Sequence, residues 1–282
     1  MLGKTVVITG ATSGIGSVAG RRLAQLGARI VFVARDRQRA QETLRELRAA
    51  GAGQAHTAFY ADLSRLSEMK RVAAEIAAAE PKIDVLMNNA GLIASRNQRT
   101  EDGLELMLAT NHLSYFVLTN LLLERLRAAG GARVVSTASE AHRRGRLDFA
   151  RMQELKGAAG YGTTKLCNIL FTRELARRIA GSGVTANCLH PGFVATRFGD
   201  SAGGALHTGL AIAKRLFALS PEDGAKTMVY LATSAEVAGR SGGYYDRCAP
   251  SEPSRAARND ADAKRLWELS AEITAIGAEA AC

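Results

Sequence analysis

Short apolar runs alternate with amphipathic stretches along most of this chain of 282 residues. The apolar runs predict strands over residues 5–10, 28–35, 56–62, 84–91, 133–139, 184–192 and 242–246. The amphipathic stretches predict helices over residues 14–26, 37–49, 65–79, 103–129, 160–180, 222–234 and 255–276. Strands that are apolar throughout are typical of a parallel sheet that is covered on both faces.

The regular alternation favours one α/β fold over its main rival. The succession of strands and helices predicts a doubly wound parallel sheet of about seven strands, with helices on both faces and right-handed crossovers. A closed (β/α)8 barrel needs one more strand–helix unit than the sequence offers. No linker-like segment divides the sequence. We therefore expect a single domain over residues 1–282.

The composition excludes several classes of protein. Hydrophobic residues make up 47% of the chain and charged residues 23%, a balance typical of soluble globular proteins. No window approaches about 18 uninterrupted apolar residues, and the N-terminus lacks a secretory signal pattern, so we expect no membrane anchor and no secretion. The cysteines and histidines are scattered without ligand spacing, which predicts no metal site and a reducing, cytoplasmic location.

The net charge of +10 at pH 7 raises the question of a polyanionic partner. The basic residues are spread over the whole chain, and their densest cluster is RRGR at residues 143–146. A cluster of this length is too short for a nucleic-acid-binding stripe. We therefore expect no nucleic-acid partner.

Two long connections interrupt the alternation, at residues 140–159 and 193–220. Both follow the carboxyl ends of predicted strands, where open α/β sheets bind their ligands. Long loops at that edge often form substrate walls or lids. We interpret residues 193–220 as a candidate substrate lid, with a plain surface insertion as the alternative.

The segment TGATSGIG at residues 9–16 ends the first predicted strand and begins the first helix. Its glycines have the spacing GxxxGxG rather than the more common GxGxxG. Glycines allow a tight turn and a close approach to a pyrophosphate, and a helix N-terminus offers unpaired N–H groups. The segment predicts a dinucleotide phosphate site, although glycine-rich turns also serve only to reverse a chain. Its candidate residues are Gly10, Ser13, Gly14, Ile15 and Gly16.

The second predicted strand ends in VARDR, at the position that meets the adenosine ribose in such folds. A basic residue there accommodates the 2′-phosphate of NADP, and an acidic one binds the 2′-hydroxyl of NAD. Arg35 is the expected phosphate partner, with Arg37 as a possible helper, since a guanidinium binds phosphate through paired hydrogen bonds. NADP (NADPH) is therefore the predicted cofactor. NAD, bound through Asp36, is the alternative.

The segment YGTTK at residues 161–165 holds a tyrosine and a lysine four positions apart. Residues at this spacing share one face of a helix, so Tyr161 and Lys165 can point into one site. A nearby ammonium favours the phenolate, so we expect Lys165 to lower the pKa of Tyr161. The tyrosine then becomes a usable general acid and base. A chance pair is the alternative.

Several motifs together resemble the short-chain dehydrogenase/reductase family, which has a Rossmann-type fold. These motifs are TGATSGIG, NNAG at residues 88–91, Asn111, Ser139 and YGTTK. The resemblance extends from Lys4 to about Asp246. The segments LATNHLSYFVLTNLLLERL at 108–126 and RVVSTASEAH at 133–142 are similar to the retinol dehydrogenase branch, as is the step from Ser139 to Tyr161.

The resemblance implies a role for each motif residue. Tyr161 exchanges a proton with the substrate oxygen, Ser139 hydrogen-bonds that oxygen, and Asn111 supports a water path to the lysine. Lys165 holds the nicotinamide ribose. The other residues expected to line the cofactor are Asp62, Leu63, Asn89, Ala90, Gly91, Pro191, Gly192, Val194 and Thr196.

The motifs together predict a function. We expect a dinucleotide-binding and catalytic domain, an NADP-dependent oxidoreductase that interconverts a carbonyl and an alcohol. The expected substrate is an apolar ketone or aldehyde, retinal-like or a secondary metabolite, as for a ketoreductase. The resemblance also implies a homo-oligomer that pairs through the helices around 104–129 and 160–180. A non-catalytic NAD(P)-binding sensor or scaffold is the alternative.

Many members of the branch carry a lysine where this chain has Ser17, which removes one possible 2′-phosphate contact.

Overall fold

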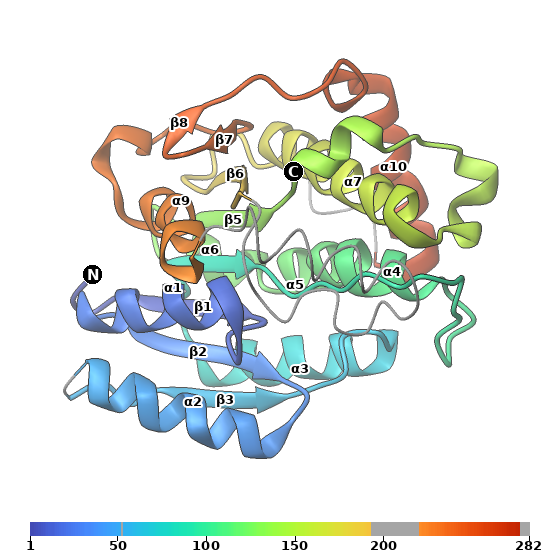
Figure 1. Ribbon diagram of the computed structural model, residues 1–282. Helices are drawn as coiled ribbons and strands as arrows, with labels where there is room; N and C mark the ends of the chain where they lie inside the picture. Colours follow the sequence, from blue (N-terminus) through green and yellow to red (C-terminus); the bar gives the residue numbers. More distant parts are fainter. Residues whose placement is uncertain (52, 193–219, 277–282) are drawn as a thin grey trace.

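An eight-stranded sheet forms the centre of the computed structural model, which describes residues 1–51, 53–192 and 220–276. The strand order is β3-β2-β1-β4-β5-β6-β7-β8 (Figure 1). Every neighbouring pair is parallel except β7 and β8, which are antiparallel. The strands are β1 Thr5–Thr9, β2 Arg29–Ala34, β3 Thr57–Tyr60, β4 Val85–Asn88, β5 Arg133–Thr137, β6 Thr185–His190, β7 Tyr244–Asp246 and β8 Ala249–Pro250.

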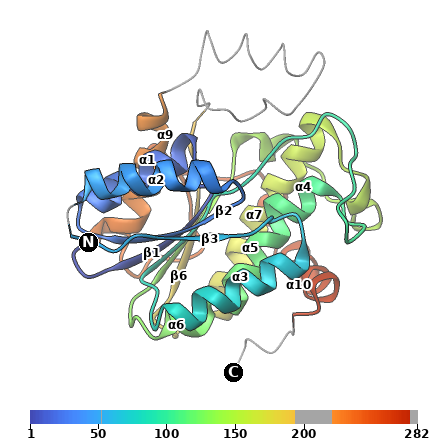
Figure 2. The same ribbon diagram turned by 90° about the horizontal axis from the view of Figure 1, so that it is seen from below.

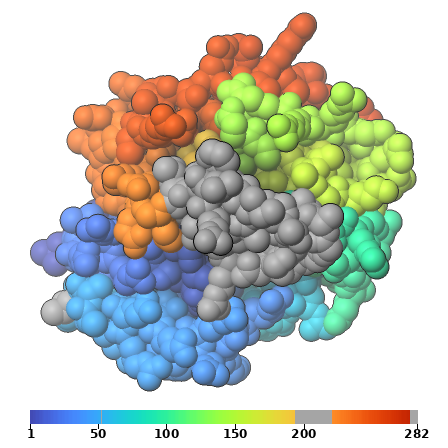
Figure 3. Space-filling model, viewed as in Figure 1, coloured from blue at the N-terminus to red at the C-terminus, as the bar shows by residue number. Residues whose placement is uncertain are grey.

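The predicted doubly wound sheet is confirmed, with one short strand more than expected. Strand β1 pairs with both β2 and β4, so the strand order reverses at β1. The additional strand β8 arises because Arg247 and Cys248, with φ of 48° and 61°, turn the chain back immediately after β7. Consistent with the strand order, the parts of the chain around β3 and around β8 lie on opposite sides of the molecule (Figure 3).

Helices cover both faces of the sheet, as Figure 2 shows. Each face is sealed by its own apolar cluster, because successive residues of a strand point to opposite faces. On β5, for example, Val134 belongs to one cluster and Val135 to the other. One face carries α1 Gly14–Gln25, α2 Arg37–Ala50 and α9 Pro221–Thr233. The other face carries α3 Leu66–Ala79, α5 Ser114–Leu121, α6 Leu123–Arg127 and α7 Gly157–Arg178.

The long helix expected over residues 103–129 is interrupted in the structure. Gly103 has a φ of 74°, and the Glu105 carboxylate caps the short helix α4 Leu106–Leu108 by accepting from its N–H groups. A π-helical turn over Ala109–Leu113 then separates α4 from α5. The chain breaks the helical pattern again at Leu122, between α5 and α6. A continuous apolar pattern does not reveal such breaks, because it runs on through them: the residues of the π-helical turn are buried, and so are Leu118, Leu122 and Leu123 around the second break.

The two remaining boundary predictions also change. The connection 140–159 contains two 3-10 helices, Glu140–Arg144 and Phe149–Glu154, and α7 begins earlier than expected, at Gly157. The C-terminal helix expected over 255–276 is α10 Asp260–Thr274, preceded by a 3-10 turn. Within the expected lid at 193–220, only Ser220 lies among the described residues, and its hydroxyl caps α9. None of the described helices is both long and apolar enough to cross a bilayer.

Helix α10 lies on the outer side of α7 and closes the apolar cluster there. The Trp267 ring stacks on Phe171 at 5.8 Å between centroids, and the Phe116 ring meets the tryptophan edge-on at 4.9 Å. All three side chains are buried, with exposures of 0 to 3%. This aromatic group joins α5, α7 and α10 into one layer.

We expect Phe116→Ala to lower the free energy of unfolding by about 3–5 kcal/mol, because it leaves a cavity among packed rings. Leu121→Ala, on the same helix but 39% exposed, should cost about 1 kcal/mol or less. Urea denaturation followed by circular dichroism measures both. Equal losses in the two variants would contradict the aromatic packing described for α5, α7 and α10.

Candidate active site

The carboxyl ends of β1 and β4 are fastened together by Thr9 and Asn89. The Thr9 hydroxyl oxygen accepts from the backbone N–H of Asn89 at 2.9 Å and of Ala90 at 3.0 Å. In return, the Asn89 amide Nδ2 donates to the carbonyl oxygens of Thr9 and Gly10 at 3.0 and 3.2 Å. These bonds lie where the strand order reverses, which is the edge at which such sheets bind ligands.

Two glycines of TGATSGIG allow the loop to pack on this junction. A Cβ atom on Gly16 would lie 2.2 Å from the carbonyl oxygen of Gly10 and 2.5 Å from Asn89 Nδ2. Gly10 has a φ of 70°, and a Cβ there would lie 2.9 Å from the same amide nitrogen. The structure therefore gives Gly10 and Gly16 a packing role against Asn89, in addition to the turn predicted from the sequence.

The N-terminus of α1 offers backbone donors to an anion. Ser13 is its N-cap residue, yet the serine side chain makes no capping hydrogen bond, and the first turn carries no acidic residue. Gly14 has a φ of 57°, which turns the chain into the helix. The N–H groups of Gly14, Ile15 and Gly16 belong to the first turn, whose donors have no intrahelical acceptor. Such a helix end favours a phosphate group.

At the end of β2, the Asp36 side chain is bound to other residues of the protein, whereas the Arg35 side chain is not bound to any described residue. Asp36 caps α2, since its carboxylate accepts from the Arg39 N–H at 3.1 Å and pairs with the Arg39 guanidinium at 3.6 Å. The Arg37 guanidinium stacks over the Tyr60 ring at 4.2 Å. Arg35 is exposed and has no hydrogen bond or ion pair with any residue that the structure describes. It is therefore the available cation at this strand end.

Those of the other residues expected to line a cofactor that the structure describes lie at the same edge of the sheet. Asp62 follows β3, and its Oδ1 accepts from the N–H and the hydroxyl of Ser64 at 3.0 and 2.8 Å. The Leu63 side chain packs into the core, so only its backbone can face a ligand. Pro191 and Gly192 follow β6 directly, and Gly192 has a φ of 85°. Val194 and Thr196 lie outside the described residues.

Asn111 lies in the middle of the π-helical turn and holds the segment after β4. Its Oδ1 accepts from the Leu92 N–H at 2.8 Å, and its Nδ2 donates to the Leu92 carbonyl at 2.8 Å. The same Nδ2 also donates to the Thr164 hydroxyl at 3.1 Å. A Cβ on Gly91 would lie 3.2 Å from Asn111 Oδ1 and 3.7 Å from the Lys165 amine. The asparagine thus joins the NNAG segment to α7.

Ser139, Tyr161 and Lys165 meet between the end of β5 and the first turns of α7. The Ser139 hydroxyl accepts from the Ala141 N–H at 3.2 Å and is hydrogen-bonded to the Tyr161 phenol. Lys165 Nζ donates to the carbonyl of Thr137 at 2.8 Å and lies 5.6 Å from the centre of the Tyr161 ring. The structure therefore brings together Asn111, Ser139, Tyr161 and Lys165, the four residues expected to be catalytic.

Burial controls the protonation of this group, contrary to one expectation. It lowers the pKa of Lys165 to about 7. Burial also raises the pKa of Tyr161 well above its usual value, and the hydrogen bond with Ser139 opposes that rise only in part. The predicted lowering of the Tyr161 pKa by Lys165 is wrong for the protein alone. The amine is half neutral near pH 7, and both groups favour the uncharged form in this buried position.

Sequence reasoning missed several supporting residues. Thr9 and Thr164 stand inside the quoted motifs, but the motifs do not show what their hydroxyls bind. Thr164 accepts from Asn111 and donates to the Tyr161 carbonyl at 2.8 Å, a contact that its position three residues after Tyr161 permits. Asn168, three residues after Lys165, donates to the same Thr137 carbonyl as the lysine, at 3.1 Å.

His142, three residues after Ser139 in the sequence, lies behind that serine in the structure. It is fully buried, its Nδ1 donates to the Ser139 carbonyl at 2.7 Å, and its Nε2 accepts from the Ser254 N–H at 3.0 Å. Burial lowers the pKa of this imidazole. With both nitrogens bonded, His142 supports Ser139 rather than exchanging protons. Among the described residues, no cluster of His, Cys, Asp or Glu side chains has the arrangement of a metal site.

Comparison with known proteins places this geometry in context. A family model described as short chain dehydrogenase matches residues 4–206. Retinol dehydrogenase 14 of Mus musculus is 40% identical over 98% of this chain and 87% of its own length. Retinol dehydrogenase 13 of Homo sapiens is 37% identical over 99% of this chain and 86% of its own length.

Two solved structures are similar over most of the chain. The crystal structure of an uncharacterised protein from Mycobacterium paratuberculosis has a TM-score of 0.78 and 33% identity, and the match covers 97% of this chain and 94% of that one. The crystal structure of an actinorhodin polyketide ketoreductase with NADPH has a TM-score of 0.67 and 26% identity, over 86% of this chain and 95% of that one.

The low pKa of Lys165 predicts a pH dependence of stability. An unfolded lysine titrates near pH 10.4, so between about pH 7 and 10 the unfolded chain binds more protons than the folded one. This lysine therefore makes the free energy of unfolding rise with pH in that window. From about pH 7 to 9, we expect wild type to gain about 2 kcal/mol relative to Lys165→Met in urea denaturation.

Lys264→Met removes an exposed lysine on α10 and is the matched control for the loss of a positive charge. Its difference from wild type in the free energy of unfolding should be the same at pH 7 and pH 9. If the difference between Lys165→Met and wild type is also the same at both pH values, the pKa of Lys165 is not lowered.

Proposed function

Because the chain belongs to the short-chain dehydrogenase/reductase family, we propose that it is an NADP(H)-dependent oxidoreductase that interconverts a carbonyl and an alcohol. One observation carries the proposal. Ser139 from the end of β5 and Tyr161 from α7 share a hydrogen bond, with Lys165 one helical turn away. Two hydroxyls that meet in this way can both bond to a single substrate oxygen.

The roles of the side chains follow from their positions and protonation. When bound, the dinucleotide supplies or accepts the hydride. In reduction, the Tyr161 phenol donates its proton to the carbonyl oxygen, and the Ser139 hydroxyl stabilises the charge that develops there. Because its pKa is about 7, Lys165 exchanges protons near neutral pH and, when protonated, favours the phenolate that Tyr161 leaves. Asn111 keeps Leu92 and Thr164 in place around this group.

The choice of NADP over NAD is supported by which of the two side chains, Arg35 or Asp36, is available to a ligand. The Asp36 carboxylate caps α2 and pairs with Arg39, so it is not available to a ribose hydroxyl without losing the cap. Arg35 is exposed and available to a 2′-phosphate. The donors at the α1 N-terminus fit the pyrophosphate of either dinucleotide.

The substrate is proposed to be an apolar ketone or aldehyde, retinal-like or a secondary metabolite. This choice is supported by relatives named retinol dehydrogenases and by the fold match with a polyketide ketoreductase. We also propose a cytoplasmic location and a homo-oligomer. The alternative, a non-catalytic NAD(P)-binding sensor or scaffold, gives no reason for a Ser139 hydroxyl bonded to the Tyr161 phenol.

We expect Arg35→Ala to weaken NADPH binding about tenfold, because it removes the hydrogen bonds of a cation to the 2′-phosphate. NADH binding should be unchanged. Titrations followed by nicotinamide fluorescence measure both affinities. Arg45→Ala is the matched control, since it removes another exposed arginine, on α2, without touching Asp36. An NADH preference in wild type would move the assignment to Asp36 and overturn the NADP proposal.

We expect Tyr161→Phe to lower kcat by at least about a hundredfold on the best substrate from a screen of apolar ketones and aldehydes with NADPH. NADPH affinity should be retained, because the ring and its packing remain. Tyr245→Phe removes the hydroxyl of a buried tyrosine on β7 and should leave turnover unchanged. Full turnover in Tyr161→Phe would contradict the mechanism, and NADPH binding without turnover of any carbonyl by wild type would favour the sensor alternative.

A further inference from the structure

The π-helical turn over Ala109–Leu113 carries Asn111 and needs support to keep its shape. The Ser114 N–H donates to the Ala109 carbonyl five residues back, which is the bond that defines the turn. Such turns are rare in proteins and occur mostly inside α-helices at functional sites. Asn111 must present both ends of its amide to the Leu92 backbone, so the orientation of this turn decides whether those bonds form.

His112, the next residue of the turn, points in another direction and reaches α10. The imidazole is 1% exposed, and its Nε2 lies 2.9 Å from the Ser270 hydroxyl oxygen. Ser270 itself is buried, and its hydroxyl donates to the Leu266 carbonyl at 2.7 Å. The imidazole N–H is therefore the donor in the bond to Ser270. Burial lowers the pKa of His112 to about 4, so the ring stays neutral and this bond persists at working pH.

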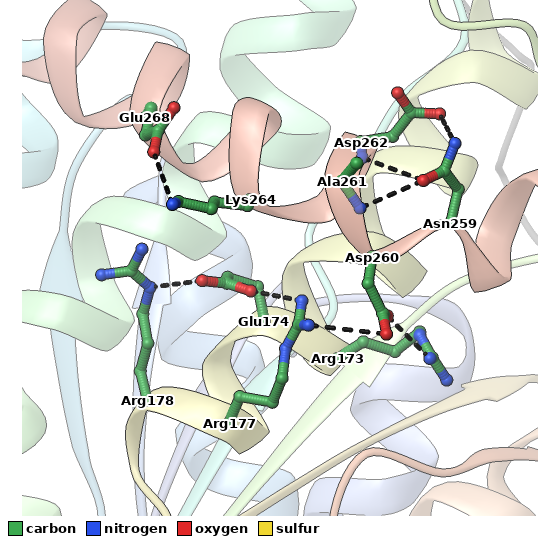
Figure 4. A network of polar contacts seen from close by, with 10 residues as sticks. All are labelled: Arg173, Glu174, Arg177, Arg178, Asn259, Asp260, Ala261, Asp262, Lys264 and Glu268. Atoms are coloured by element: carbon green, nitrogen blue, oxygen red, sulfur yellow. Dashed lines mark hydrogen bonds and ion pairs between the residues drawn. The ribbon is translucent and has the colours of Figure 1, made fainter.

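Helix α10 is itself held firmly against α7. Figure 4 shows Asp260, at the first turn of α10, between the guanidinium groups of Arg173 and Arg177, with distances of 2.9 and 3.6 Å. Glu174 pairs with Arg177 and Arg178 in the same network. Arg178 in turn lies over the Trp267 ring at 4.6 Å. Ser270 is thus presented to His112 from a helix whose first turn is held by ion pairs and whose centre is packed.

We propose that His112 and Ser270 are positioning residues for the active site, through which the C-terminal helix α10 holds the π-helical turn and the Asn111 amide in place. This inference rests on the proposed oxidoreductase function, because the residues that are positioned belong to its proposed active site. The contacts follow one line, from Ser270 to His112, through the turn to Asn111, and from Asn111 to Leu92 and Thr164. The Thr164 hydroxyl then bonds the carbonyl of Tyr161.

The chain offers a matched pair of variants on one helix. Ser270→Ala removes the hydroxyl that accepts from His112. Thr274→Val removes a hydroxyl one turn later, which is equally buried and bonds only the Ser270 carbonyl among the described residues. Both variants lose a buried hydroxyl on α10, so both are expected to show a similar, small fall in melting temperature. Only Ser270→Ala loses the contact with the turn.

Two readouts test the proposal. Hydrogen exchange of the Leu92 amide, which Asn111 Oδ1 protects, should be about tenfold faster in Ser270→Ala and unchanged in Thr274→Val. With NADPH and the best carbonyl substrate, kcat should fall about tenfold in Ser270→Ala with little change in KM, and stay near wild type in Thr274→Val. His112→Phe should match Ser270→Ala, and the double variant should be no worse than either single one.

The outcomes distinguish a failure of the positioning role from a failure of the proposed oxidoreductase function. Equal Leu92 exchange in Ser270→Ala and Thr274→Val would overturn the positioning role, whatever the turnover. Additive losses in the double variant would also overturn it, because the two residues would then act independently. The exchange measurement needs no substrate. If wild type turned over no carbonyl but Leu92 exchange still rose only in Ser270→Ala, the proposed function would fail and the structural coupling would stand.

Discussion

The reciprocal hydrogen bonds between Thr9 and Asn89 are the constraint on which the site depends. They join β1 and β4, two neighbouring central strands that are followed by helices on opposite faces of the sheet. The bonds lie at the carboxyl ends of both strands, where the polypeptide leaves the sheet. The loop before α1 rests on Asn89 so closely that only glycine fits at Gly16. The position of the α1 N-terminus, and with it the proposed phosphate site, is therefore set from the side of β4. The NNAG segment supports the neighbouring loop as well as lining the cleft.

Local patterns in the sequence predicted the sheet, most helix positions and the pairing of Tyr161 with Lys165, because burial on both faces imposes apolar strands and a shared helix face imposes the spacing of that pair. The candidates Asn111 and Ser139 came from the family resemblance, not from a local pattern. Three features escaped prediction for physical reasons. The π-helical turn around Asn111 keeps its side chains buried, so the apolar pattern continues through it. The contact of Gly16 with Gly10 depends on packing between segments. Strand β8 depends on two residues with left-handed backbone after β7.

The protonation of the site shows the limit of reasoning from spacing. Two residues four apart on a helix are neighbours, but their spacing does not reveal how much water surrounds them. Burial acts on both groups in the same sense, toward the neutral phenol and the neutral amine. In the proposed mechanism, charge at Tyr161 would develop in a place that disfavours it, and its stabilisation would depend on the Ser139 hydroxyl and on a protonated Lys165. The proposed mechanism would be sensitive to small displacements of the Ser139 hydroxyl or of Lys165. The hydrogen bonds of Asn111, His142 and Thr164, which hold the surrounding segments in place, are therefore important for it.

The cap of α2 links two properties that are usually discussed separately. Asp36 stabilises the helix by accepting from the Arg39 N–H, a contribution of about 1 kcal/mol for a typical N-cap. Under the proposed choice of NADP, the same carboxylate is the group that would bind the ribose of NAD instead. A lineage that changed its cofactor at this position would have to give up the cap or find another residue to provide it. Folding thermodynamics at one helix end thus acts as a barrier to the evolution of cofactor preference.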